Sequence, residues 1–258
     1  MCENTPFQEL KDFLDEQVEI YNTPDFIVND PISIPHAFTL KQDVEIIGFF
    51  AAILAWGQRK TIINKCFELS DRMGGHPYDF IKNHSQEDLK LLEGFKHRTF
   101  NDTDLLYLID FLQRHYQSFD GLEDAFLNDG KFISIEDSLR NFHEKVFSAE
   151  YAPGRTQKHI ATPAKKSTCK RLNMYLRWMV RKDDCGVDFG IWNRIPQSKL
   201  ICPIDVHVHR TSRELALIER PQTDWITALE LTDNLRQLDS DDPVKYDFAL
   251  FGLSVNRK

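Results

Sequence analysis

Apolar residues recur every three or four positions over most of the chain, and this spacing limits the fold more than any other feature. Residues 7–21 are a clear case, with Phe7, Leu10, Leu14, Val18 and Tyr21 on one helix face. The same spacing predicts further helices at about 43–55, 60–73, 86–93, 103–117, 121–128, 134–148, 167–181, 206–217, 223–237 and 242–253. No segment alternates with the period of a β-strand. The sequence therefore predicts an all-α protein.

Length and composition exclude several classes of protein. The chain has 258 residues, of which 41% are hydrophobic, enough for one large domain or two closely packed ones. Its longest uncharged apolar run, residues 46–58, falls short of the roughly 20 residues of a membrane span. The N-terminus has neither the basic flank nor the apolar core of a secretory signal. The five cysteines are scattered without C-x-x-C spacing, so we expect reduced thiols, a cytoplasmic location and no zinc finger.

Charge is distributed unevenly along the chain. The formal net charge is −8, yet residues 151–182 contain nine Lys or Arg residues and no Asp or Glu. A basic segment in an acidic protein is typical of local contact with phosphate groups. A solvated basic helix face is the alternative interpretation. The sequence leaves both open.

The segment L-I-C-P-I-D-V-H-V-H-R, residues 200–210, holds the sharpest candidate for chemistry. Asp205 stands where an apolar run becomes a helix, which is the position of an N-cap. Its carboxylate either only caps that helix or also faces a cleft. A metal-dependent hydrolase is a further alternative, because Asp205, His207 and His209 would share one face of a strand. On a helix, positions i and i+2 diverge, and the two histidines would not bind one ion.

Two further segments carry candidate residues. In C-K-R-L-N-M-Y-L-R-W-M-V-R-K, residues 169–182, Lys170 opens a predicted helix. A lysine there is either an amine nucleophile that forms a Schiff base or an exposed lysine that contacts phosphate or solvent. In A-A-I-L-A-W-G-Q-R-K-T-I-I-N-K, residues 51–65, a helix ends and another begins. Gln58 and Arg59 lie at this corner, which is either purely structural or the mouth of a cleft.

Taken together, the three segments resemble the helix-hairpin-helix DNA glycosylase superfamily, which includes endonuclease III and 8-oxoguanine DNA glycosylase. K-R-L-N-M-Y-L is similar to the catalytic K-x-A-N-x-x-L pattern, with Lys170 on the lysine and Asn173 on the asparagine. P-I-D-V-H is similar to P-V-D-V-H, with Asp205 on the catalytic aspartate. I-L-A-W-G-Q resembles L-L-S-A-Q, with Gln58 on the glutamine that fills the gap left by a flipped base. The segments also resemble an uncharacterised bacterial family that shares K-R-L-N-M-x-L-R-W-M-V-R-K-D-D.

The resemblance implies one glycosylase-like unit made of two helical subdomains with a cleft between them. The central subdomain is expected at about 43–182, and the second at about 1–42 plus 183–258. The implied activity is excision of a damaged base, with an oxidised purine as the candidate, from double-stranded DNA. Lys170 would be the nucleophile, with abasic-site lyase activity, and Asp205 the electrostatic stabiliser. The residues expected to bind DNA are Gln58, Arg59, Lys165, Lys166, Arg171, Asn173, His207 and Arg210.

This chain departs from the superfamily in the turn before the lysine. The L-P-G-x-G hairpin is absent, and I-A-T-P-A-K-K-S-T-C-K stands there without a glycine. Glycines let backbone amides approach a phosphate closely, so lysine side chains would have to hold the phosphate here. No four-cysteine cluster motif follows, and no iron–sulfur cluster or other cofactor is expected. A catalytically silent module that binds nucleic acid or protein is the main alternative function. The sequence does not indicate the oligomeric state.

Overall fold

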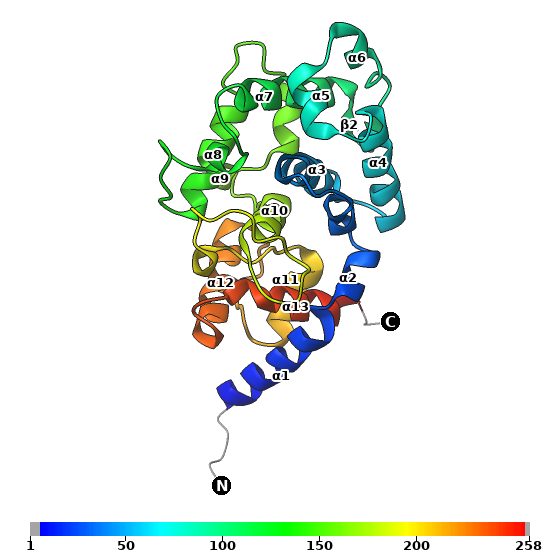
Figure 1. The fold of residues 1–258 in the computed structure, drawn as a ribbon. Helices are drawn as coiled ribbons and strands as arrows, with labels where there is room; N and C mark the ends of the chain where they lie inside the picture. Colours follow the sequence, from blue (N-terminus) through cyan, green and yellow to red (C-terminus); the bar gives the residue numbers. More distant parts are fainter. Residues whose placement is uncertain (1–5, 256–258) are drawn as a thin grey trace. The chain divides into compact units, whose positions relative to one another are not determined.

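The computed structural model of the chain describes residues 6–255, and the fold is built from helices (Figure 1). The α-helices are α1 Pro6–Tyr21, α2 Pro24–Val28, α3 Lys41–Leu54, α4 Arg59–Arg72, α5 Pro77–Asn83, α6 Gln86–Lys90, α7 Asp102–Tyr116, α8 Glu123–Phe126, α9 Ile135–Val146, α10 Lys170–Val180, α11 Val206–Glu214, α12 Trp225–Leu238 and α13 Tyr246–Val255. Short 3₁₀ helices are η1 Pro31–Ser33, η2 Pro35–Ala37, η3 Gly154–His159, η4 Pro163–Lys165, η5 Gln197–Lys199 and η6 Pro243–Lys245. The predicted all-α class is confirmed.

Strand structure within residues 6–255 is limited to one small hairpin and an isolated bridge between Asn128 and Lys131. The hairpin strands are β1 Lys96–His97 and β2 Phe100–Asn101, with Lys96 opposite Asn101 and His97 opposite Phe100. Strands of two residues are too short to show an alternating pattern, so this hairpin was not predicted.

The chain divides into two compact units. Unit 1 comprises residues 6–26 and 163–255 of the described chain, and unit 2 comprises residues 27–162. Both boundaries differ from those expected. The segment carrying η1 and η2 belongs to unit 2 because Ile32 and Ile34 are buried and both 3₁₀ helices pack against α3. Helix α10 belongs to unit 1 because the loop after it folds back, with the Trp192 amide donating to the Met179 carbonyl at 2.9 Å. The expected cleft between the subdomains stays a prediction.

Unit 2 is organised around α3, which is buried from Asp43 to Leu54. This agrees with the nearly unbroken apolar run that predicted a buried helix at 43–55. Helices α4 and α5 pack against it. The carboxylate of Glu45 is buried within α3 and accepts hydrogen bonds from the Tyr116 hydroxyl at 2.9 Å and the Leu122 amide at 3.1 Å. Such partners offset the cost of removing a carboxylate from water.

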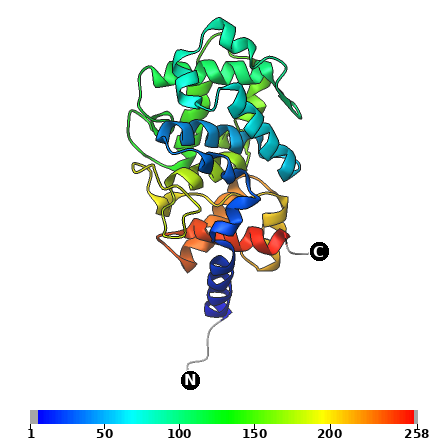
Figure 2. The ribbon, with the colours of Figure 1, turned by 45° about the vertical axis from the view of Figure 1, so that its right-hand side comes forward.

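Unit 1 is organised around α13, which packs against α1 and α11; α1 and α13 lie side by side in Figures 1 and 2. A glycine is needed where α1 meets α13. A Cβ atom at Gly252 would lie 2.3 Å from the Tyr21 ring. Phe26 extends this contact, with its ring edge-to-face on Phe248 at 5.1 Å between centroids. The close approach of the two helices therefore depends on one missing methyl group.

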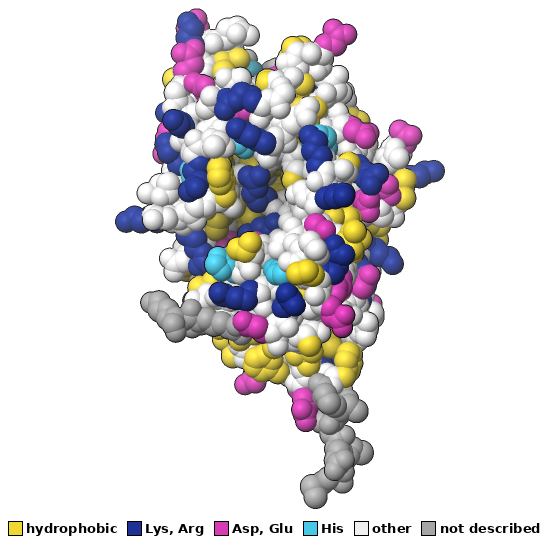
Figure 3. Space-filling model, turned by 180° about the vertical axis from the view of Figure 1, so that it is seen from behind, with side chains coloured by type: hydrophobic (Ala, Val, Ile, Leu, Met, Phe, Trp, Pro, Cys, Tyr) yellow, Lys and Arg dark blue, Asp and Glu magenta, His cyan; other side chains and the backbone are white. Residues whose placement is uncertain are grey.

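Between residues 6 and 255, none of the helices combines the length and the apolar character needed to cross a membrane. Figure 3 shows one face of the molecule, on which Lys and Arg side chains are numerous and are interspersed with smaller hydrophobic areas.

Candidate functional site

Lys170 and Asp205 are 35 positions apart in the sequence, and unit 1 brings them together. Lys170 is the first residue of α10, and Asp205 is the N-cap of α11. The Lys170 Nζ atom lies 3.8 Å from the Asp205 Oδ2 atom, and their side chains are 26% and 30% exposed. An amine and a carboxylate thus face each other at a point that solvent reaches. This pair is the core of the candidate site.

The two oxygens of Asp205 have different partners. Oδ1 accepts the backbone N–H groups of His207 at 2.9 Å and Val208 at 3.0 Å, which caps α11. Oδ2 faces Lys170. The cap fixes the orientation of the carboxylate, because its first oxygen is held by the helix. Capping and facing the amine are therefore compatible.

The turn before α10 has two residues in the left-handed region although it lacks glycine. Lys166 has φ +58° and Cys169 has φ +52°. The side-chain amide of Asn173 donates to the Thr168 carbonyl at 3.0 Å, and the Trp225 amide donates to the Lys166 carbonyl at 3.2 Å. These bonds hold a backbone conformation that costs energy in residues with a side chain. They also set where α10, and hence Lys170, begins.

Asn173 is 1% exposed, and its Oδ1 atom has no hydrogen-bond partner among the described residues. It was expected to contact DNA. In this structure a side chain so deeply buried positions the turn through its amide group instead. Contact with a ligand would require it to move.

A buried ionic cluster lies in unit 1 and includes the C-terminal part of α10. Arg177 pairs with Asp247 and, at 3.2 Å, with Asp188. Arg181 pairs with Asp183, Asp188 and Asp242 at 2.7, 3.0 and 2.9 Å. The interpretation of the whole basic segment as a phosphate-binding surface is thus wrong for these two arginines. Their charges are neutralised internally by Asp183 and Asp188 in the loop that follows α10, and by Asp242 and Asp247 near the C-terminus.

Asp247, in α13, is within electrostatic reach of the candidate pair. Burial raises the pKa of its carboxyl to about 6, Arg177 and Lys170 oppose this rise, and Asp205 adds to it. The sequence analysis missed this residue. The available signal was an acid in the otherwise apolar stretch Y-D-F-A-L-F-G-L. The charges of Lys170 and Asp205 therefore influence the protonation of the buried Asp247 carboxyl.

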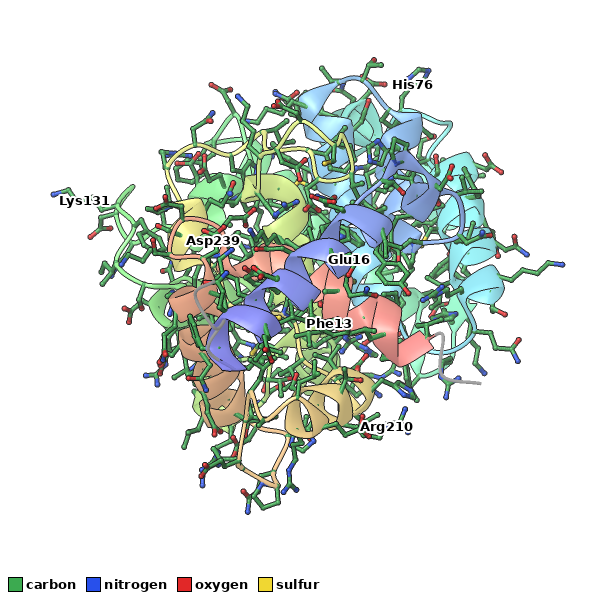
Figure 4. All side chains as sticks on the ribbon, turned by 90° about the horizontal axis from the view of Figure 1, so that it is seen from below. Phe13, Glu16, His76, Lys131, Arg210 and Asp239 are labelled. Atoms are coloured by element: carbon green, nitrogen blue, oxygen red, sulfur yellow. The ribbon has the colours of Figure 1, made fainter. Side chains whose placement is uncertain are left out.

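The other predicted DNA-binding residues of unit 1 lie around the two helix starts. Lys165 and Lys166 are exposed in the turn, and Arg171 is half-buried, which lowers the pKa of its guanidinium. On α11, His207 and Arg210 are exposed, and Figure 4 places Arg210 at the periphery of that helix. All of them except Arg171 are open to solvent, as contact with phosphate would require.

The metal-site alternative is not supported by the arrangement of its residues. Residues 206–214 form a helix, so His207 and His209 point in different directions. The His209 Nε2 atom lies 3.0 Å from the Arg220 carbonyl and is engaged there. No group of three or more His, Cys, Asp or Glu side chains within residues 6–255 is placed to hold a metal ion.

Gln58 and Arg59 belong to unit 2, at the start of α4. Gln58 is the N-cap residue, but its side chain makes no capping hydrogen bond, and both residues are exposed. The side chain of Gln58 therefore takes no part in capping α4. Its relation to Lys170 and Asp205 stays a prediction.

A family model described as "Protein of unknown function (DUF2400)" matches residues 30–256, which is most of the chain. No curated protein matches the chain. No solved structure matches it either. The resemblance to the glycosylases is not tested by these comparisons and stays a prediction.

Proposed function

Because the chain belongs to the DUF2400 family, whose function is unknown, we propose a function from its own residues: it is a DNA glycosylase with abasic-site lyase activity. The observation that carries the proposal is the 3.8 Å separation of the Lys170 amine and the Asp205 carboxylate in a solvent-accessible position. The motif resemblance of the same two residues supports it independently. In this arrangement the amine can attack a sugar carbon as a nucleophile, and the fixed carboxylate can stabilise the positive charge that develops there.

In the proposed reaction the amine of Lys170 attacks the anomeric carbon of a flipped nucleotide. The N-glycosidic bond breaks, its electron pair leaves with the base, and the base takes up a proton. Asp205 Oδ2 stabilises the positive charge on the sugar and accepts a proton from the lysine nitrogen. The bond between the anomeric carbon and the ring oxygen then breaks as the nitrogen lone pair forms the C=N bond of the Schiff base, and the ring oxygen takes the proton back from Asp205. Strand cleavage next to the abasic site follows from that Schiff base. Unstacking costs least for a damaged or mispaired base, which contributes to selectivity.

The test is incubation of the protein with duplexes carrying single lesions, oxidised purines first, in the presence of borohydride. Wild-type protein is expected to release the base and to form a reduced covalent complex. Lys170→Gln is expected to abolish the complex. Lys199→Gln, an exposed lysine of unit 1 in η5, is the matched control and is expected to retain it. Absence of base release and trapping across the panel would contradict the proposal.

Asp205→Asn separates chemistry from stability, because asparagine caps a helix about as well as aspartate. We expect it to slow base release by about 10²-fold or more, a magnitude typical of losing one electrostatic stabiliser, with the melting temperature nearly unchanged. Asp205→Ala also removes the cap and is expected to cost about 1 kcal/mol of stability. Base release by Asp205→Asn at the wild-type rate would exclude the proposed role of the carboxylate.

A catalytically silent nucleic-acid-binding module is the second candidate. It is favoured by the turn before α10, where the glycines of the glycosylase hairpin are replaced by A-K-K-S-T-C. Such a module would bind duplex DNA with a steep salt dependence and process no lesion. The lesion panel distinguishes the two candidates directly.

A further inference from the structure

Arg98, at the tip of the β1–β2 hairpin in unit 2, lies over the ring of Trp56. Its guanidinium carbon is 4.5 Å from the ring centroid. Arg98 is exposed, and it makes no hydrogen bond or ion pair with any other residue in the described range 6–255. Stacking holds the guanidinium plane while leaving the N–H groups in that plane available.

The backbone around this stack is arranged to make room for it. Gly57 has φ +112°, and a Cβ atom there would lie 3.0 Å from Arg98 Nη1. The ring nitrogen Nε2 of His97 lies 3.1 Å from the Trp56 carbonyl and ties the hairpin to the α3–α4 corner. Arg98 itself has φ +55°, a left-handed conformation that only surrounding contacts maintain. The position of this arginine is thus specified by three neighbouring residues.

A third segment braces the other side of the hairpin. Arg155, in η3, donates to the Thr99 carbonyl at 3.1 Å and to the Asn101 side chain, and it lies 3.4 Å from the buried Asp104 carboxylate. Trp56 and Gly57 therefore contact Arg98, and Arg155 holds the hairpin residues next to it. These residues come from the segments 55–66, 95–101 and 151–162. Together these segments hold seven Lys or Arg residues and no Asp or Glu: Arg59, Lys60, Lys65, Lys96, Arg98, Arg155 and Lys158.

We infer that Arg98, held on Trp56, binds a backbone phosphate of duplex DNA. A planar guanidinium fork matches two phosphate oxygens, and the hairpin segment 95–101 itself holds no acid that would repel the phosphate. A nucleic acid is favoured over an acidic protein because duplex DNA is the substrate of the proposed function. Only this choice of partner rests on the proposed function.

The test is binding of an undamaged, fluorescently labelled duplex, measured by anisotropy over a series of salt concentrations. Arg98→Gln is expected to weaken binding by about tenfold, the value of one charge-assisted hydrogen bond. It is also expected to reduce the slope of log K against log salt by about 0.9, the value for one phosphate contact. Arg98→Lys keeps the charge without the planar fork, and an intermediate affinity is expected.

Two further variants control for misfolding and for a general change of charge. Arg98→Gly suits the left-handed backbone, so a loss of binding in this variant does not stem from misfolding. Lys131→Gln changes the charge of unit 2 equally at an exposed residue that Figure 4 labels well outside the ribbon, and it is expected to bind as wild type. Binding by Arg98→Gln and Arg98→Gly with wild-type affinity and slope would overturn the inference. Equal Arg98-dependent binding of a poly-glutamate chain would overturn the assignment to nucleic acid.

Failure of this inference is distinguishable from failure of the proposed function, because the duplex carries no lesion. Arg98-dependent binding without any borohydride trapping would contradict the enzyme alone. Trapping with Arg98-independent binding would contradict the phosphate contact alone.

Discussion

Asp205 uses its two carboxylate oxygens for two different purposes. One oxygen accepts two backbone N–H groups at the start of α11, and the other faces the Lys170 amine. The cap fixes the carboxylate and leaves Oδ2 facing the amine. The same residue therefore stabilises the fold and orients the candidate site.

Asp247 makes the stability of unit 1 depend on pH. Burial raises the pKa of its carboxyl to about 6, above the value of about 4 for an unfolded chain. The folded protein therefore holds this proton more tightly. Its contribution to the free energy of unfolding is fully present below about pH 4 and is lost as the pH rises to about 6.

Asp247→Asn removes this titration. The stability of wild type relative to the variant is expected to fall between about pH 4 and pH 7, by at most about 3 kcal/mol. Urea unfolding at several pH values measures the difference, with the exposed Asp241→Asn as the control. A difference that stays constant over this range would show that Asp247 does not titrate as described.

At the scale of the elements, α1 and α13 meet through the missing side chain of Gly252. Gly252→Ala would place a methyl group 2.3 Å from the Tyr21 ring. We expect a loss of about 1–3 kcal/mol of stability, as is typical of overpacking. Gly154→Ala is the matched control, because a Cβ atom there meets nothing within 4 Å. Equal melting temperatures for the two variants would contradict the packing of α1 on α13.

Helices with a clear apolar face were predictable, and so were the short helices α6 and α8, whereas α2 and α5 were not. The prediction of 43–55 agrees closely with α3, since burial on all sides leaves an apolar run that is easy to recognise. Helix α5, Pro77–Asn83, was missed because two turns offer too few positions to show a period. Helix α10 begins at Lys170 rather than near 167, because Cys169 takes a left-handed conformation that the sequence does not announce.

The candidate pair was predictable because motif resemblance named both residues, whereas the residues around it depend on tertiary contacts. Arg177 and Arg181 looked like part of a basic surface and are buried in ion pairs. The acids that neutralise them lie in the following loop and in the last helices. Only the folded chain shows which charges of a basic segment remain at the surface.

For the whole molecule, the lysines that are exposed in the turn before α10 lead to a further prediction about DNA binding. Lys165 and Lys166 are exposed, unlike the two arginines later in the same segment. The double variant Lys165→Gln, Lys166→Gln is expected to weaken duplex binding and to lower the salt slope by about 1.8, the value for two phosphate contacts. Anisotropy titrations measure this slope, and an unchanged slope would remove the turn from the proposed DNA surface.

The central claim is that the Lys170 amine is the nucleophile, and the most direct test is to locate the covalent bond. Wild-type protein is incubated with a duplex containing an abasic site, reduced with borohydride, digested and analysed by mass spectrometry. We predict a sugar adduct on the peptide that contains Lys170, and none in the Lys170→Gln variant. An adduct on another lysine, or trapping of Lys170→Gln at the wild-type yield, would contradict the account.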